Sequence, residues 1–149
     1  MRTFSFNLTA CLAFVMITAV GEREAFACEC SGLPSVASVG DSDVIYIGRV
    51  TAIREGRRFA WPEIEFSVRD KLKGPVGKAF VLQTGTQKGM SCEGFDFTIG
   101  KTYLVLAAER YSITGRAGTY GVNWCAGTTL VDTDEGKKAL REVRKLIKK

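Results

Sequence analysis

The chain has 149 residues, which is enough for one domain and short for two. Hydrophobic residues make up 46% and charged residues 25%, which is typical of a folded globular protein and not of a disordered chain. The net charge is +5, and the absence of histidine excludes Ser-His-Asp and Cys-His catalysis, histidine general bases and His-ligated zinc.

Residues 1–27 have the pattern of a secretory signal peptide. Arg2 supplies an early positive charge, residues 4–20 are almost wholly apolar or small, and Ala25-Phe26-Ala27 is typical of a signal peptidase site. A membrane-spanning helix is the alternative, but an apolar stretch of about 17 residues is at the low limit for spanning. We therefore expect cleavage after Ala27, a secreted or periplasmic protein, and a mature chain that begins at Cys28.

A lipoprotein signal would also place a cysteine first in the mature chain. The sequence before Cys28 lacks the leucine expected three residues ahead of a lipidated cysteine, and Phe26 is bulky for such a site. Lipidation is therefore the less favoured interpretation.

Cleavage would remove Cys11 and leave four cysteines, at 28, 30, 92 and 125. An even count in a small exported domain predicts two disulfides. Four cysteines allow three pairings, and a bridge between Cys28 and Cys30 would close a strained ring, so both are expected to reach across the fold. A cysteine metal site is the alternative, which oxidising export and the absence of histidine disfavour.

Most of the mature chain has the alternation and composition of β-strands. We expect a short helix over 34–39, a bulge at Gly48, a turn at 73–77, and strands over 43–53, 63–69, 79–84, 103–107 and 120–124. Five strands, glycine-rich turns and no internal repeat predict an all-β fold, a small Greek-key barrel closed by one C-terminal helix.

The predicted C-terminal helix spans about 133–149, and Asp132 with Glu135 resembles a capping box at its start. Its apolar stripe consists of Ala139, Leu140, Val143, Leu146 and Ile147. Residues 137–149 hold seven Lys or Arg and one Glu, whereas 28–136 are nearly neutral. The basic face is either the solvated back of a docked helix or a surface that attracts anionic lipid headgroups or an acidic partner.

No arrangement of residues predicts an enzyme or a resident cofactor. Glu63 and Glu65 would share a strand face, but solvent exposure explains them better than acid/base catalysis. The acidic residues at 132, 134 and 135 lack the spacing of a calcium loop. Nucleic-acid binding needs aromatic residues in a basic groove, and the cations here lie on the C-terminal helix instead.

Several short motifs occur together in a recognisable order. They are Cys28-Glu29-Cys30 directly after the predicted cleavage site, Pro34, residues 43–50, Phe66-Ser67-Val68 leading to Leu72-Lys73-Gly74, Ser91-Cys92, residues 100–105, and Trp124-Cys125-Ala126-Gly127-Thr128. In this order they resemble the netrin-like module, and within it the bacterial proteins similar to tissue inhibitors of metalloproteinases. The resemblance implies a five-stranded OB-type barrel with disulfides Cys28–Cys92 and Cys30–Cys125.

The resemblance also implies that the protein inhibits zinc metalloendopeptidases. The α-amine and carbonyl oxygen of Cys28 would chelate the zinc of the protease, whose catalytic site keeps one coordination position open. Glu29, Cys30 and Ser31 would form the inhibitory edge, and Glu29 stands where such inhibitors usually carry a small hydroxyl residue. The inhibitor itself would need no metal and would act as a monomer. The alternative is a netrin-like binding module of the cell envelope without inhibitory activity.

Overall fold

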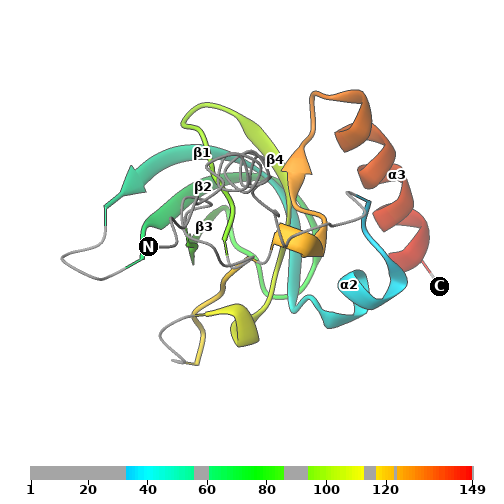
Figure 1. The fold of residues 1–149 in the computed structure, drawn as a ribbon, viewed down its shortest axis with the longest axis horizontal. Helices are drawn as coiled ribbons and strands as arrows, with labels where there is room; N and C mark the ends of the chain where they lie inside the picture. The colour runs from blue at the N-terminus through cyan, green and yellow to red at the C-terminus, as the bar shows by residue number, and fades with distance from the viewer. Residues whose placement is uncertain (1–32, 56–60, 86–93, 113–116, 123, 149) are drawn as a thin grey trace, which may run out of the picture.

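In the computed structural model, the described residues are 33–55, 61–85, 94–112, 117–122 and 124–148. They form a five-stranded antiparallel sheet with the strand order β3-β2-β1-β4-β5 and a long C-terminal helix (Figure 1). The elements are α2 (Val36–Asp41), β1 (Val44–Arg54), β2 (Glu63–Lys73), β3 (Ala79–Gln83), β4 (Thr102–Ala107), β5 (Thr129–Leu130) and α3 (Asp134–Ile147), with short 3-10 helices at Glu109–Tyr111 and Trp124–Ala126. No helix in this part of the chain is long and apolar enough to cross a membrane.

The prediction of a mostly β protein with one closing helix is confirmed. The sheet itself is open, with β3 and β5 at its two edges. Register shifts interrupt the pairing of β1 with β2, one of them between Ile47 and Gly48, which confirms the expected irregularity at this glycine. Strand β2 continues to Lys73 and is longer than expected, because its second half pairs with the first half of β1.

The predicted fifth strand over 120–124 is wrong. Gly121 makes only isolated bridges, a parallel one to Gln83 at the end of β3 and an antiparallel one to Ala108 after β4. A side chain at Gly121 would overlap the backbone carbonyl of Tyr111, so only glycine fits at this position. The chain then turns into the Trp124–Ala126 helix, and the fifth strand forms later, at Thr129–Leu130.

Two hydrophobic clusters lie on opposite faces of the sheet. One face carries an aromatic cluster that includes Tyr46, Phe66, Phe97 and Tyr103. The other face is covered by the two helices and includes Ile45, Leu104, Leu106, Ala139 and Val143. Strands β1 and β4 alternate between the two clusters, and every residue of β4 is buried because both of its faces are covered.

Helix α3 is docked on the sheet, as its apolar stripe predicts. Ala139 and Val143 are fully buried, and Leu140 and Leu146 pack against the same cluster. Ile147, expected in this stripe, is instead partly exposed at the last turn.

The start of α3 differs from the expected capping box. Thr133 is the N-cap and its hydroxyl accepts a hydrogen bond from the Gly136 amide at 3.0 Å, whereas Asp132 makes no such cap. A side chain at Gly136 would overlap the backbone carbonyl of Leu130. The first turn of the helix therefore lies directly against the end of β5.

Candidate functional site

The residues expected to form the inhibitory edge, Cys28, Glu29, Cys30 and Ser31, lie outside the described residues, as does Cys92. The structure describes two chain segments next to this edge. One runs from Leu33 into α2, and the other is the turn that contains Cys125.

Pro34 and Gly127 lie against each other although they are far apart in the sequence. A Cβ added at Gly127 would lie 2.9 Å from Cγ of Pro34 and 3.0 Å from its Cα and N atoms. Gly127 also has a φ of 91°, a left-handed conformation that favours glycine. The residues just after the expected inhibitory edge are thus placed directly beside the residues that follow Cys125.

Cys125 lies in the short 3-10 helix Trp124–Ala126 and takes part in a disulfide. The next residue, Ala126, is buried in the same cluster as Val39 of α2. Two residues further on, the buried Thr128 hydroxyl accepts a hydrogen bond from the Leu106 amide at 3.1 Å. These contacts fix the turn around Cys125 to the central strand β4.

A capping box fixes the direction in which the chain leaves Pro34. The Ser35 hydroxyl accepts a hydrogen bond from the Ser38 amide at 3.0 Å, and the Ser38 hydroxyl accepts one from the Ser35 amide at 2.8 Å. At the other end of α2, the Lys73 ammonium donates to the backbone oxygens of Val39 and Gly40 at 2.9 and 3.1 Å. Both ends of this six-residue helix are therefore held by hydrogen bonds.

The two carboxylates of β2, Glu63 and Glu65, each have a partner on a neighbouring strand. The Glu65 carboxylate forms an ion pair with Arg54 at 2.6 Å. The Glu63 carboxylate accepts a hydrogen bond from the side-chain amide nitrogen of Gln83, Nε2, at 3.4 Å. In the described parts of the chain no three acidic or cysteine residues gather as a metal site would require. The carboxylates thus serve cross-strand pairing.

No protein-family model and no curated protein matches this chain.

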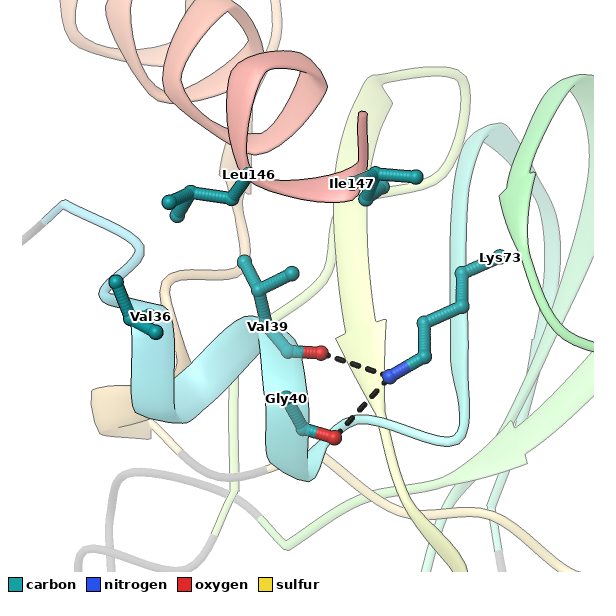
Figure 2. Close-up of a pocket in the computed structure, with 6 residues that line it drawn as sticks. All are labelled: Val36, Val39, Gly40, Lys73, Leu146 and Ile147. Atoms are coloured by element: carbon teal, nitrogen blue, oxygen red, sulfur yellow. Dashed lines mark hydrogen bonds between the residues drawn. The ribbon is translucent and has the colours of Figure 1, made fainter. Parts of the chain in front are cut away.

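Sequence reasoning did not predict a groove between the two helices. It holds about 570 Å³ and is lined by Val36, Val39, Gly40, Lys73, Leu146 and Ile147. Figure 2 shows α2 on one side, the last turn of α3 on the other, and the Lys73 side chain reaching across to the carbonyl oxygens of α2. No local pattern could have indicated this groove, because its walls come from three segments that only the tertiary fold brings together.

Proposed function

We propose that the protein is a secreted inhibitor of zinc metalloendopeptidases, similar to the tissue inhibitors of metalloproteinases. Its reactive group would be the N-terminal residue of the mature chain, Cys28. A free α-amine has a pKa of about 7.7–8.0, so a fraction is neutral at pH 7 and can donate its lone pair to a metal. The amine and the carbonyl oxygen of Cys28 together would close a five-membered chelate ring on the protease zinc.

The observation that carries this proposal is the motif Cys28-Glu29-Cys30 at the predicted mature N-terminus, followed by Pro34, which lies against Gly127. Pro34 contacts Gly127, which is two residues from the disulfide-bonded Cys125. Cys30 is four residues before Pro34, and four extended residues span at most about 14 Å. The resemblance implies a Cys30–Cys125 disulfide together with Cys28–Cys92, and this span is compatible with the first of them.

Two such disulfides would hold the first three residues of the mature chain in one conformation. A binding segment that is already ordered loses less conformational entropy when it binds its partner. Helix α2 would also help to hold this segment in one conformation, because its hydrogen bonds fix the chain immediately after Pro34.

The strand arrangement supports an OB-type barrel as the scaffold. Gly121 bridges both Gln83 at the end of edge strand β3 and Ala108 after β4, and the Gln83 amide donates to the Tyr120 carbonyl at 2.9 Å. The segment around Gly121 therefore spans from one edge of the sheet toward its middle. We propose that these contacts close the sheet into the barrel that the resemblance implies.

In this proposal, Glu29 determines which proteases the protein inhibits. In the inhibitors that the chain resembles, the side chain after the first cysteine enters the specificity pocket of the protease. A carboxylate buried in an apolar pocket carries a desolvation cost. The target would therefore be a protease whose pocket carries a positive charge.

The test uses the mature protein, a form with one extra alanine before Cys28, and the Glu29→Thr variant, each assayed against a panel of zinc endopeptidases. The extra residue moves the α-amine away from the chelating position and leaves the cysteines in place. We expect the extended form to keep its circular dichroism spectrum and lose inhibition, and Glu29→Thr to inhibit proteases with apolar pockets more strongly. Equal inhibition by the extended form would disprove the chelation mechanism. If none of the three inhibits any protease, the non-inhibitory envelope module is the better proposal.

A further inference from the structure

The outer side of β3 carries backbone groups that point away from the sheet. β3 lies at one edge of the sheet and pairs along its length with β2. In an antiparallel pair, successive residues direct their amide and carbonyl groups alternately toward the partner strand and away from it. The Val68 amide of β2 donates to the Lys78 carbonyl oxygen at 2.8 Å, and the register continues this pattern at Phe80 and Leu82. The odd-numbered residues of β3 therefore direct their backbone groups outward.

One of these outward residues already has a strand-like neighbour. The Gln83 amide donates to the Tyr120 carbonyl oxygen at 2.9 Å, as part of the parallel bridge to Gly121. The other two, Ala79 and Val81, make no backbone hydrogen bond on this side to any described residue. Their two amides and two carbonyl groups thus continue a row that, at Gln83, pairs with an extended segment of the chain.

Both faces of this free edge offer apolar side chains. Val81 is 49% exposed and is one of the four large hydrophobic side chains that the described residues expose. On the opposite face of the strand, the half-buried Phe80 ring contacts the rings of Tyr46 and Tyr120, with centroids 5.1 and 5.3 Å apart. Successive residues of an added strand point to opposite faces. Such a strand would meet an apolar side chain on each face, so consecutive residues of it would be apolar.

Two cations lie where this edge begins. Lys78 directly precedes the free backbone groups, and Arg69 directly follows Val68, which bonds to Lys78. Both cations are exposed, and neither forms an ion pair with a carboxylate of the described chain. Glu65, which lies opposite Val81, pairs with Arg54 at 2.6 Å instead. The charge at the start of the edge therefore matches a carboxylate from another molecule.

We propose that the edge of β3 binds an extended segment of a partner protein by strand addition. The segment carries apolar residues at its centre and a carboxylate beside Lys78 and Arg69. In this mode of recognition, main-chain hydrogen bonds supply affinity and the alternating side chains supply specificity. A second copy of the chain would also satisfy the backbone groups, but its β3, Ala79–Gln83, has no acidic residue to pair with the cations.

The experiment measures binding of a short labelled peptide to the mature protein, recovered from an exporting host, by fluorescence anisotropy. The probe has consecutive valines at its centre and a glutamate at each end, so either strand direction brings a carboxylate to the cations. The control probe carries lysine in place of both glutamates. We expect saturable binding of the acidic probe only, and weaker binding at about 1 M salt, where charges more than about 3 Å apart are screened.

N-methylated forms of the acidic probe test whether its backbone pairs with the strand. The amides of an added strand alternately face the edge and point away from it. A methyl group on one central amide should therefore abolish binding, whereas a methyl group on the next amide should leave binding nearly unchanged.

Variants of the protein locate the site. R69Q/K78Q should weaken binding of the acidic probe by about fivefold, as expected for exposed ion pairs. The matched control K138Q/K148Q removes the same charge from exposed positions of α3 and its C-cap, and it should bind like the wild type. Val81→Pro removes one outward amide and no hydrogen bond to β2, and it should abolish binding. If Val81→Pro does not fold, the N-methylated probes still decide the question.

Three results would overturn the proposal. One is no saturable binding of the acidic probe, another is equal binding of the two N-methylated probes, and the third is equal loss of binding in the two double variants. A dimer in sedimentation equilibrium, together with no binding of the probe, would assign the edge to a second copy of the chain instead. None of these readouts involves the Cys28 amine, so the result is independent of the proposed inhibition.

Discussion

The aromatic ring of Tyr46 covers Gly48 on the same face of β1. A Cβ at position 48 would lie 2.9 Å from Cε2 of Tyr46 and 3.1 Å from Cδ1 of Phe66. The same ring makes an edge contact with Phe66, with centroids 5.5 Å apart, and a tilted contact with Phe80 at 5.1 Å. Because Gly48 has no side chain, there is room for the ring of Tyr46, the largest fully buried side chain of the core.

Gly48→Ala should therefore destabilise the protein. The added methyl group would push the Tyr46 and Phe66 rings out of their packing, and overpacking of this kind costs about 1–3 kcal/mol. Gly40→Ala is the matched control, because nothing lies within 4 Å of a Cβ at that helical position. The control should gain about 0.5–1 kcal/mol from reduced chain entropy. Urea unfolding of both variants measures the difference. Equal free energies of unfolding would show that the Tyr46 ring does not need the space that Gly48 leaves.

Tyr46 carries a hydroxyl that has no hydrogen-bond partner among the described residues, although its ring is fully buried. Tyr46→Phe removes this unsatisfied group and should be neutral or stabilise the protein by about 1 kcal/mol. Tyr103→Phe is the control, since the Tyr103 hydroxyl accepts a hydrogen bond from the Thr98 amide at 3.0 Å. That variant should lose about 1 kcal/mol. The reverse order of stabilities in urea would contradict the burial of a free hydroxyl at position 46.

The same residue predicts how stability changes in alkaline solution. Burial raises the pKa of Tyr46 well above its ordinary value of 10.0. The phenol stays protonated in the folded protein while it ionises in the unfolded chain, so the stabilising contribution is complete below pH 10 and is lost as the pH rises further. Stability measured above pH 10 should fall more steeply for the wild type than for Tyr46→Phe. Parallel curves would show that Tyr46 has an ordinary pKa.

Val143 is one of the buried residues that hold α3 on the sheet. Val143→Ala should cost about 2 kcal/mol, through lost burial and the cavity that remains. Arg141→Ala changes an exposed residue of the same helix and should stay within about 0.5 kcal/mol of the wild type. Thermal unfolding distinguishes the two, and a melting temperature that Val143→Ala leaves unchanged would mean that α3 adds little to the stability of the domain.

The ion pair between Arg144 of α3 and Asp70 of β2 should contribute much less than Val143. Both side chains are about half exposed, at 52% and 46%, and exposed pairs contribute about 0–1 kcal/mol. Asp70→Asn should therefore lower the unfolding free energy by less than Val143→Ala, with an effect that disappears at high salt. A larger loss for Asp70→Asn would show that electrostatics, and not burial, docks the helix.

The disulfide pairing that the resemblance implies leads to a prediction of its own. Peptide mapping of the unreduced mature protein should recover a peptide that joins Cys30 to Cys125 and another that joins Cys28 to Cys92. Gly127→Val should slow oxidative folding, because the new side chain would displace Pro34 and the segment before it. Recovery of Cys28 joined to Cys125 would contradict the proposed pairing and the geometry of the inhibitory edge.

The local pattern of the sequence was sufficient for the elements whose burial follows a simple period. Apolar runs predicted β1 and β4, alternation predicted the first part of β2, and a helical stripe predicted that α3 would dock through Ala139 and Val143. These segments bury a regular face or lie in the centre of the sheet, so their own residues specify the structure that they adopt.

The tertiary structure decided the features that depend on close approach between distant segments. Gly121 reads as part of a strand, yet it is held between Gln83 and Ala108, so the fifth strand forms at Thr129–Leu130 instead. The contact of Pro34 with Gly127 and the groove between α2 and α3 likewise have no local signal. Periodicity reports which face of a segment is buried, whereas the identity of the neighbour depends on how the whole chain packs.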